Sequence, residues 1–249
     1  MITGILLDMI SMAGKDTSRN AVLFAENKVP FFSRLGEITS EDIAIRIMSS
    51  LIASTVTYLL FQFLYSGGAV LTVGLGLGHV QEWRPLFGEF TEIWSLRNTW
   101  NKFWHQGMGT SLRVPAHFIT VKILRLPKHS LFGGYAYALL VFGLSGLVHV
   151  VGDIASGMKF RETSVMHWFL IQALGFVLED LFIAIYRKIT GTRNRHPKNI
   201  PTWQKAVGFA WVFSWMLWTL PAWNYPIARK SEGEGVLPFS IVEFLVSGR

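Results

Sequence analysis

The amino-acid sequence predicts an all-α, polytopic transmembrane protein with four or five crossings and a Trp-rich amphipathic helix in one of its loops. Of the 249 residues, 51% are hydrophobic and only 16% are charged, which is typical of membrane proteins and unlike a soluble globular domain. Lys and Arg residues gather in the polar stretches between the apolar ones. The net charge of +7 therefore indicates membrane topology, and we expect no nucleic-acid partner.

Residues 1–42 are only mildly apolar and are expected to form an N-terminal surface segment with one short helix. Asp8 interrupts the first apolar run, which also lacks the basic start of a signal peptide. Residues 43–249 are expected to form the membrane domain. The absence of Cys excludes disulfides, a thiolate nucleophile and Cys-ligated metals.

The first membrane region begins with Ile47–Tyr65, which is long enough to cross a bilayer once, with Arg46 placed to snorkel at one end. Gly67 and Gly68 are predicted to break this helix. The following stretch, Ala69–Val80, is apolar, Gly-rich and short. It is either a second, thin crossing or a re-entrant piece, which is why the expected number of crossings is four or five.

The longest polar connection, Gln81–Ser130, is unusually rich in aromatic residues and is expected to fold against the membrane or into the protein. Ser95 is a suitable N-cap for a short helix beginning at Leu96. On that helix Trp100 and Trp104 would share one face, and Asn101 and His105 an adjoining one. The helix either holds two polar groups beside an aromatic wall or is an interfacial helix anchored by Trp. Val114–Leu126 follows as a short amphipathic stretch bounded by Pro115 and Pro127.

The stretch Leu131–Val151 carries no charge over 21 positions, and as a helix it would span about 30 Å, the thickness of a hydrocarbon core. It contains one ionisable residue near its end, His149. A histidine inside a membrane helix is a candidate functional residue, and the alternative is a histidine satisfied by packing. Asp153 lies four residues further on, but two ligands are too few for us to predict a metal site.

Two more crossings are expected at Ser164–Tyr186, which contains Glu179 and Asp180, and at Ala206–Trp223. The apolar stretch Val236–Val246 in the tail is too short for a crossing. The basic loop Arg187–Lys205 is assigned to the cytosol, the neutral loop after Val151 to the opposite side, and the Trp-rich loop to the cytosol.

Four ordered motifs carry a resemblance to a known family: Trp83-Arg84-Pro85-Leu86-Phe87-Gly88, Ser95-Leu96-Arg97, Trp100-x-x-x-Trp104-His105-Gln106 and Ser145-Gly146-Leu147-Val148-His149. With Leu178-Glu179-Asp180-Leu181 beyond them, they resemble the wax synthase-like branch of the membrane-bound O-acyltransferases. Within this branch, the sequence is most similar in overall character to the fungal members that acylate secondary metabolites.

The resemblance implies transfer of an acyl group, often acetyl, from acyl-CoA to a hydroxyl of an apolar small molecule such as a terpenoid or polyketide. It implies a multi-pass protein of the endoplasmic reticulum, whose partners are the bilayer, acyl-CoA and a lipophilic alcohol. Acyl-CoA would be a co-substrate, and we expect no bound cofactor and no metal.

The resemblance also assigns roles to residues. His149 corresponds to the essential histidine of the family and suits a general base, because a neutral imidazole can accept the proton of the attacking hydroxyl. His105 corresponds to a second polar position, and His105 or Asn101 could donate a hydrogen bond to the developing oxyanion. Trp100 and Trp104 are expected to contact the substrate. From their charge and their place in the cytosolic loop, and not from the resemblance, Arg97, Lys102 and Arg113 are expected to contact the phosphates of the coenzyme.

The sequence departs from the family in Arg84-Pro85, where Pro-Pro is common, and in Thr99, where an aromatic residue is usual. Family members are generally longer, which suggests an N-terminally shortened form. The alternatives are a long-chain wax or sterol ester synthase, a non-catalytic membrane scaffold or lipid-binding protein, and a proton-coupled transporter that uses His149 with Glu179 and Asp180.

Overall fold

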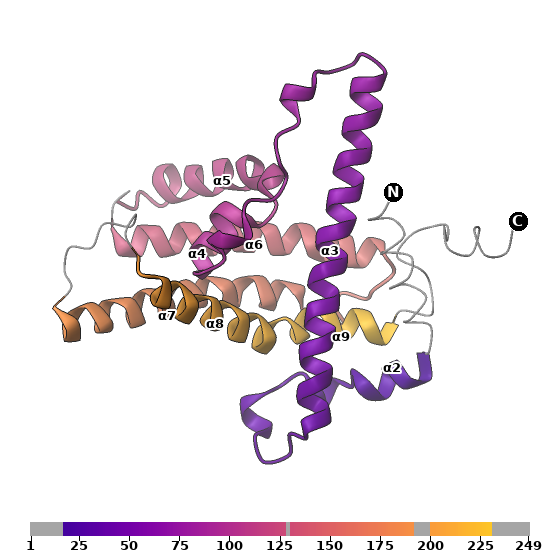
Figure 1. Ribbon diagram of the computed structural model, residues 1–249, viewed down its shortest axis with the longest axis vertical. Coiled ribbons are helices and arrows are strands. Elements are labelled where there is room, and N and C mark those ends of the chain that lie inside the picture. The colour runs from indigo at the N-terminus through magenta and orange to yellow at the C-terminus, as the bar shows by residue number, and fades with distance from the viewer. Residues whose placement is uncertain (1–16, 128–129, 192–199, 231–249) are drawn as a thin grey trace, which may run out of the picture. The chain divides into compact units, whose positions relative to one another are not determined.

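A computed structural model describes residues 17–127, 130–191 and 200–230, and within these ranges the protein is helical and contains no strand (Figure 1). The predicted all-α membrane fold is confirmed. Three described helices are long and apolar enough to cross a membrane, or four if the last two helices form one broken span. This number is close to the four or five crossings that the sequence predicts.

The described residues divide into two compact units. One lies within Met1–Pro85 and Leu220–Arg249, and the other within Leu86–Thr219. All the predicted site residues belong to the second unit.

The first unit is built around α3 (Ser40–Gly74), which follows the short helix α2 (Thr17–Leu23) and the 3-10 turns η1 (Glu26–Lys28) and η2 (Phe32–Arg34). A capping box begins α3: Asp42 N–H donates to Thr39 Oγ1 at 3.1 Å, and Thr39 N–H donates to the Asp42 carboxylate at 3.3 Å. These two bonds satisfy backbone donors that have no partner inside the helix. The start of α3 is therefore set by its own local sequence.

The helix α3 continues through Gly67 and Gly68, so the predicted break and the separate crossing at Ala69–Val80 are wrong. A helical Gly costs only about 1 kcal/mol relative to Ala, which an apolar 35-residue helix tolerates. Gly68 also has a packing role, because a Cβ there would lie 3.2 Å from the Trp83 ring. The chain leaves the helix only after Gly74, near Gly76, whose φ of +69° favours glycine.

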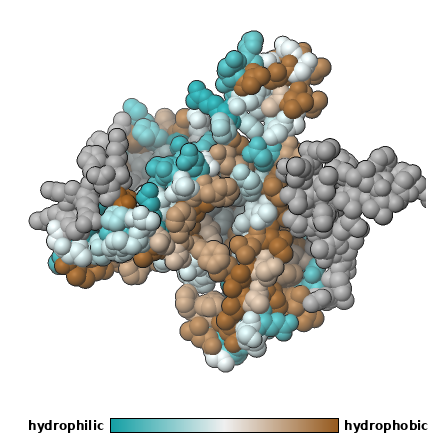
Figure 2. Space-filling view, viewed as in Figure 1, coloured by the Kyte–Doolittle hydropathy of each residue, from teal (hydrophilic) through white to brown (hydrophobic). Residues whose placement is uncertain are grey.

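Much of the α3 surface is apolar and exposed, as expected of a helix that faces lipid (Figure 2). Of its most apolar 18-residue window, only 11% is buried within the protein. Exposed apolar side chains follow the helix along its length: Ile43, Met48, Leu51, Ile52, Leu64, Val70 and Leu71.

Arg46 does not snorkel to the surface as the sequence suggests; it is 7% exposed. Its guanidinium donates to the carbonyls of Lys28 and Val29, both at 2.8 Å, and lies over the rings of Phe31 and Tyr225. Tyr225 comes from α9 (Pro221–Lys230). Arg46 therefore joins three elements of this unit, which explains how an arginine is retained in a largely apolar helix.

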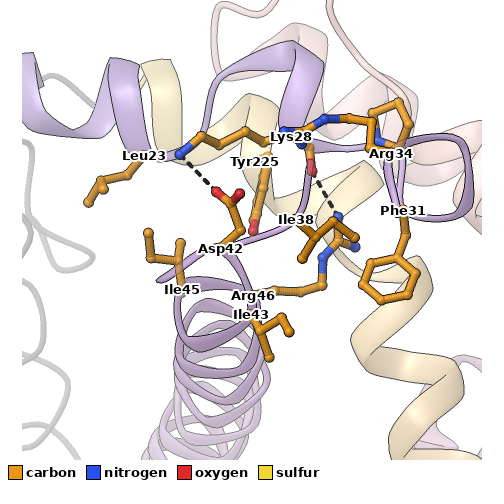
Figure 3. Close-up of a pocket in the computed structure, with 11 residues that line it drawn as sticks. Leu23, Lys28, Phe31, Arg34, Ile38, Asp42, Ile43, Ile45, Arg46 and Tyr225 are labelled. Carbon is orange, nitrogen blue, oxygen red and sulfur yellow. Dashed lines mark hydrogen bonds and ion pairs between the residues drawn. The ribbon is translucent and has the colours of Figure 1, made fainter. Parts of the chain in front are cut away.

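A small pocket opens beside Arg46, lined also by Lys28, Arg34 and Asp42 (Figure 3). Lys28 and Asp42 form an ion pair of 3.0 Å across it. The pocket leaves about 10 Å³ for the centre of a water-sized molecule, about the room that one water needs. It is lined by none of the predicted site residues.

The second unit contains the predicted spans around His149 and Glu179. The helices α6 (Leu131–Ala155) and α7 (Val165–Thr190) confirm the crossings expected at 131–151 and 164–186, and the two helices pack side by side (Figure 1). The last predicted span is divided, because α8 (Thr202–Thr219) ends before Pro221, which begins α9. Proline is suited to the first position of a helix, where no N–H is needed.

The loop before α6 is mostly helical. It contains α4 (Leu96–Asn98), the π-helix η5 (Thr99–Phe103), the 3-10 turn η6 (Gln106–Met108), α5 (Gly109–Phe118) and the π-helix η7 (Ile119–Ile123). The helix α5 runs through Pro115, so this proline is not the boundary that the sequence suggests. The tail stretch Val236–Val246 lies outside the described residues.

Candidate active site

His149 lies in α6 with one ring nitrogen fixed by its own helix. Its Nδ1 is 2.8 Å from the carbonyl oxygen of Ser145, one turn earlier. Because a carbonyl oxygen can only accept a hydrogen bond, Nδ1 must carry the proton and donate it. In the neutral imidazole the lone pair is then on Nε2. This is the tautomer that a general base requires.

The remaining residues of the Ser145–His149 motif explain why the ring is held there. The ring of His149 packs against Phe169 of α7, with 4.5 Å between ring centroids. A Cβ at Gly146 would lie 3.2 Å from Phe169 Cβ and 2.9 Å from Met166 Sδ, so glycine allows α7 to approach. Leu147 and Val148 are exposed on the outside of the helix. The Ser145 carbonyl, Gly146 and His149 therefore each have a hydrogen-bonding or packing role in this motif.

The Trp-rich segment begins as predicted but does not continue as an α-helix. Ser95 Oγ accepts the N–H of Asn98 at 3.1 Å, which confirms the expected N-cap. After Asn98 the chain forms the π-helix η5, and Trp104 N–H closes its last turn on the Thr99 carbonyl at 2.7 Å. π-helical turns are rare in proteins, and those that occur are often found at functional sites.

The helix ends at Phe103, so the prediction that Asn101 and His105 share a helical face is wrong. The carbonyl of Phe103 accepts the N–H of Gly88 at 2.9 Å, and Gln106 N–H donates to the Leu86 carbonyl at 2.8 Å. These hydrogen bonds to the preceding loop take the place of the backbone bonds that would continue the helix. As a result Trp104 adopts an extended conformation, and Asn101 is exposed.

Trp100 packs against both long helices of the unit. Its ring centroid lies 5.4 Å from that of Phe142 in α6, and 5.7 Å and 6.3 Å from those of Trp168 and Phe169 in α7. Its indole N–H is buried and has no hydrogen-bond acceptor among the described residues. A buried donor without an acceptor is unusual and needs an explanation.

His105 is half-buried and lies within electrostatic reach of His149. Burial lowers the pKa of His105 below its usual value, and the nearby His149 lowers it further. His105 is therefore neutral near pH 7, and its ring contacts that of Trp104 with 5.5 Å between centroids. The structure thus brings His149, Trp100 and His105 into one region.

The three predicted phosphate ligands have different surroundings. Arg97 is paired with Asp180 and lies over the ring of Phe176, and Lys102 is paired with Glu92 at 2.9 Å. Arg113 is exposed, and it forms no ion pair with any other described residue.

The sequence draws attention to Glu179 and Asp180 only as carboxylates that need partners. Both reach the start of α4: Glu179 accepts the N–H of Leu96, and Asp180 pairs with Arg97. No sequence signal identifies these partners, since more than 80 residues separate each pair. In the described part of the chain, no three His, Asp or Glu side chains form a group that could hold a metal.

The region between the Trp83 motif and the start of α7 matches a known family. Residues 83–171, which include Trp100, His105 and His149, match the family model described as "Membrane bound O-acyl transferase family". These residues belong to the membrane-bound O-acyltransferase family. The resemblance based on the four motifs is confirmed, and the apolar helices agree with a membrane protein.

Curated relatives extend this similarity over most of the chain. The chain is 35% identical over 228 residues to "Acetyltransferase aurG" of Calcarisporium arbuscula, an alignment covering 90% of the chain and 54% of the relative. It is 34% identical to "Acetyltransferase fsoF" of Humicola fuscoatra, over 88% of the chain and 54% of the relative. It is 36% identical to "Acetyltransferase atnC" of an Arthrinium species, over 84% of the chain and 48% of the relative. The chain thus spans about half the length of these relatives. No solved structure matches the chain.

Proposed function

We propose that this chain carries the active site of an acetyltransferase that moves an acetyl group from acetyl-CoA to a hydroxyl of an apolar small molecule. The family match and the name acetyltransferase shared by the relatives support this reaction class. The observation that carries the proposal is the hydrogen bond from His149 Nδ1 to the Ser145 carbonyl, because it orients the ring and makes Nε2 the nitrogen that can act as the base.

In the proposed reaction His149 Nε2 accepts the proton of the acceptor hydroxyl as that oxygen attacks the thioester carbonyl. The carbon–sulfur bond then breaks, and the imidazolium of His149 returns the proton to the departing thiolate of the coenzyme. The hydrogen bond to the Ser145 carbonyl holds the ring in place and stabilises the imidazolium while it carries the proton.

Negative charge develops on the carbonyl oxygen during the attack and requires a hydrogen-bond donor. We assign the indole N–H of Trp100 to this role, because it is buried and has no acceptor within the described residues. His105 is a second donor in the same region, since its lowered pKa keeps it neutral with one N–H. Each such donor typically contributes about 3–4 kcal/mol to transition-state stabilisation.

The phosphates of the coenzyme need cationic partners outside the apolar site. Arg113 fits this requirement best, because its guanidinium is exposed and the guanidinium fork matches phosphate geometry. Lys102 is also exposed, although it is paired with Glu92. The acceptor is proposed to be a terpenoid or polyketide alcohol, and the location to be the endoplasmic reticulum membrane.

The test is acetyl transfer from radiolabelled acetyl-CoA to a mixture of lipophilic alcohols by membranes that contain the chain. His149→Ala is compared with His167→Ala, a matched control because His167 is exposed on α7. We expect label from the unmodified chain and from the control but not from His149→Ala. Equal label from all three would refute the role of His149, and no label from any would refute acetyl transfer by this chain.

A further inference from the structure

The apolar helix α7 contains a buried carboxylate, which is unusual for a helix of this kind. Glu179 is 6% exposed and belongs to a helix that is long and apolar enough to cross a membrane. A carboxylate in such a place is costly unless donors surround it. The groups that surround Glu179 therefore indicate its role.

Three N–H groups donate to the carboxylate of Glu179. They are the backbone N–H of Leu96 at 2.6 Å, the backbone N–H of Arg97 at 3.5 Å and the indole N–H of Trp211 at 3.2 Å. Leu96 and Arg97 are the first two residues of α4, whose N–H groups have no acceptor within the helix. Ser95 Oγ accepts the backbone N–H of Asn98, so each of the three backbone N–H groups of α4 has an acceptor.

Asp180 holds the same turn by its side chain. It pairs with the guanidinium of Arg97 and also accepts the phenol O–H of Tyr135 at 2.9 Å. Tyr135 belongs to α6, so this second contact ties α4 to both long helices. The guanidinium of Arg97 is further fixed over the ring of Phe176, with 4.7 Å between its central carbon and the ring centroid.

The turn that these carboxylates hold leads directly to the candidate donors. Trp100 follows Arg97 by three residues and packs against Phe169, which in turn packs against His149. His105 follows at the end of the same segment. We infer that Glu179 is a positioning residue: by accepting the first N–H groups of α4, it fixes Trp100 and His105 relative to His149. This inference rests on the proposed function for its catalytic consequence, but its structural part can be measured separately.

The principal test is Glu179→Gln in the full chain, with Glu162→Gln, a loop carboxylate outside the site, as the matched control. Glutamine keeps one acceptor oxygen, but its NH₂ group is brought against N–H donors. Hydrogen exchange of residues 95–105 should become about tenfold faster or more, while exchange at residues 165–175 should not change. The kcat for acetyl transfer should fall about tenfold or more at an unchanged KM for acetyl-CoA, because misplaced donors act on the transition state.

Unchanged exchange at residues 95–105 would overturn the inference, and so would faster exchange with an unchanged kcat. A raised KM with an unchanged kcat would also overturn it, since that result indicates substrate binding. If the unmodified chain transfers no acetyl group, the proposed function fails, and the exchange measurement alone decides whether Glu179 holds the segment. If Glu179→Gln does not fold, Glu179→Asp is used, because it retains the charge but is one methylene too short. A smaller increase in exchange at residues 95–105 is then expected, and no increase would overturn the inference.

Discussion

The close approach of α7 to α6 can be tested by adding one methyl group at Gly146. A Cβ there would lie 3.2 Å from Phe169 Cβ, 3.4 Å from Met166 Cα and 2.9 Å from Met166 Sδ. The sulfur can move at little cost, but the other two atoms belong to the body of α7. Gly143, one turn earlier, is a matched control, because a Cβ there would be 3.8 Å from Leu170 Cδ2, an ordinary contact distance.

Two effects determine the stability of these variants. Alanine stabilises a helix interior by about 1 kcal/mol relative to glycine, so Gly143→Ala should be stabilising. Gly146→Ala gains the same amount but loses about 1–3 kcal/mol through overpacking. The two variants should therefore differ by about 1–3 kcal/mol, or by several degrees in Tm. Acetyl transfer should fall only in Gly146→Ala, because Phe169 is displaced from the His149 ring.

The assay is thermal unfolding in detergent, followed by acetyl transfer at matched protein abundance. Equal Tm values for Gly146→Ala and Gly143→Ala would show that α7 does not approach Gly146 as described. A lower Tm with unchanged activity would separate helix packing from the position of His149, and would refute the link between them.

Three further predictions concern single contacts. Because the pKa of folded His105 is lowered by burial, the unfolded chain binds more protons below about pH 6.5, and the native chain should lose more stability than His105→Gln as the pH falls from about 7.5 to 5.5. Arg46→Met should cost about 1–3 kcal/mol of stability, because two carbonyls lose their donor. Arg34→Met, which breaks an i,i+3 ion pair with the exposed Glu37, should cost less than about 1 kcal/mol. Gln172→Leu should cost about 1–3 kcal/mol, because the buried indole N–H of Trp215 loses its acceptor at 3.0 Å.

Thermal unfolding measures all three. An identical pH dependence in the native chain and His105→Gln would contradict the burial of a neutral histidine. Equal losses in the two arginine variants would contradict the bridging role of Arg46. For Gln172, the added substitution Trp215→Phe should recover part of the lost stability, because it removes the unsatisfied donor, and strictly additive losses would count against the bond.

The sequence predicts those features that depend on local pattern. The charge-free run of 21 residues around His149 indicates α6, because such a stretch has few alternatives to a membrane helix. The run that ends near Glu179 and Asp180 is also long and mostly apolar, and it indicates α7. The Ser95 cap is likewise local, since its partner is three residues away. The family resemblance also rests on ordered local motifs.

The sequence does not predict features decided by distant contacts. Gly68 suggests a break, but its lack of a side chain serves the packing of Trp83. The helical spacing of Asn101 and His105 suggests a shared face, but the helix ends first. Hydrogen bonds from Gly88 N–H to the Phe103 carbonyl and from Gln106 N–H to the Leu86 carbonyl replace further helical bonds. The partners of Arg46 and Glu179 cannot be predicted from the sequence either, because they too are distant along the chain. Hydrophobic periodicity carries no information on which remote group satisfies a polar side chain.

The bond between Glu179 and the N–H of Leu96 also has a consequence for the order of synthesis. It joins residues 83 positions apart, so the acceptor for the first turn of α4 is made long after the turn itself. Until α7 emerges from the ribosome, those N–H groups have only water or lipid headgroups as partners, and they cannot enter an apolar environment at low cost. The Trp-rich segment should therefore remain at the membrane surface during translation and pack against α6 only after α7 has been inserted.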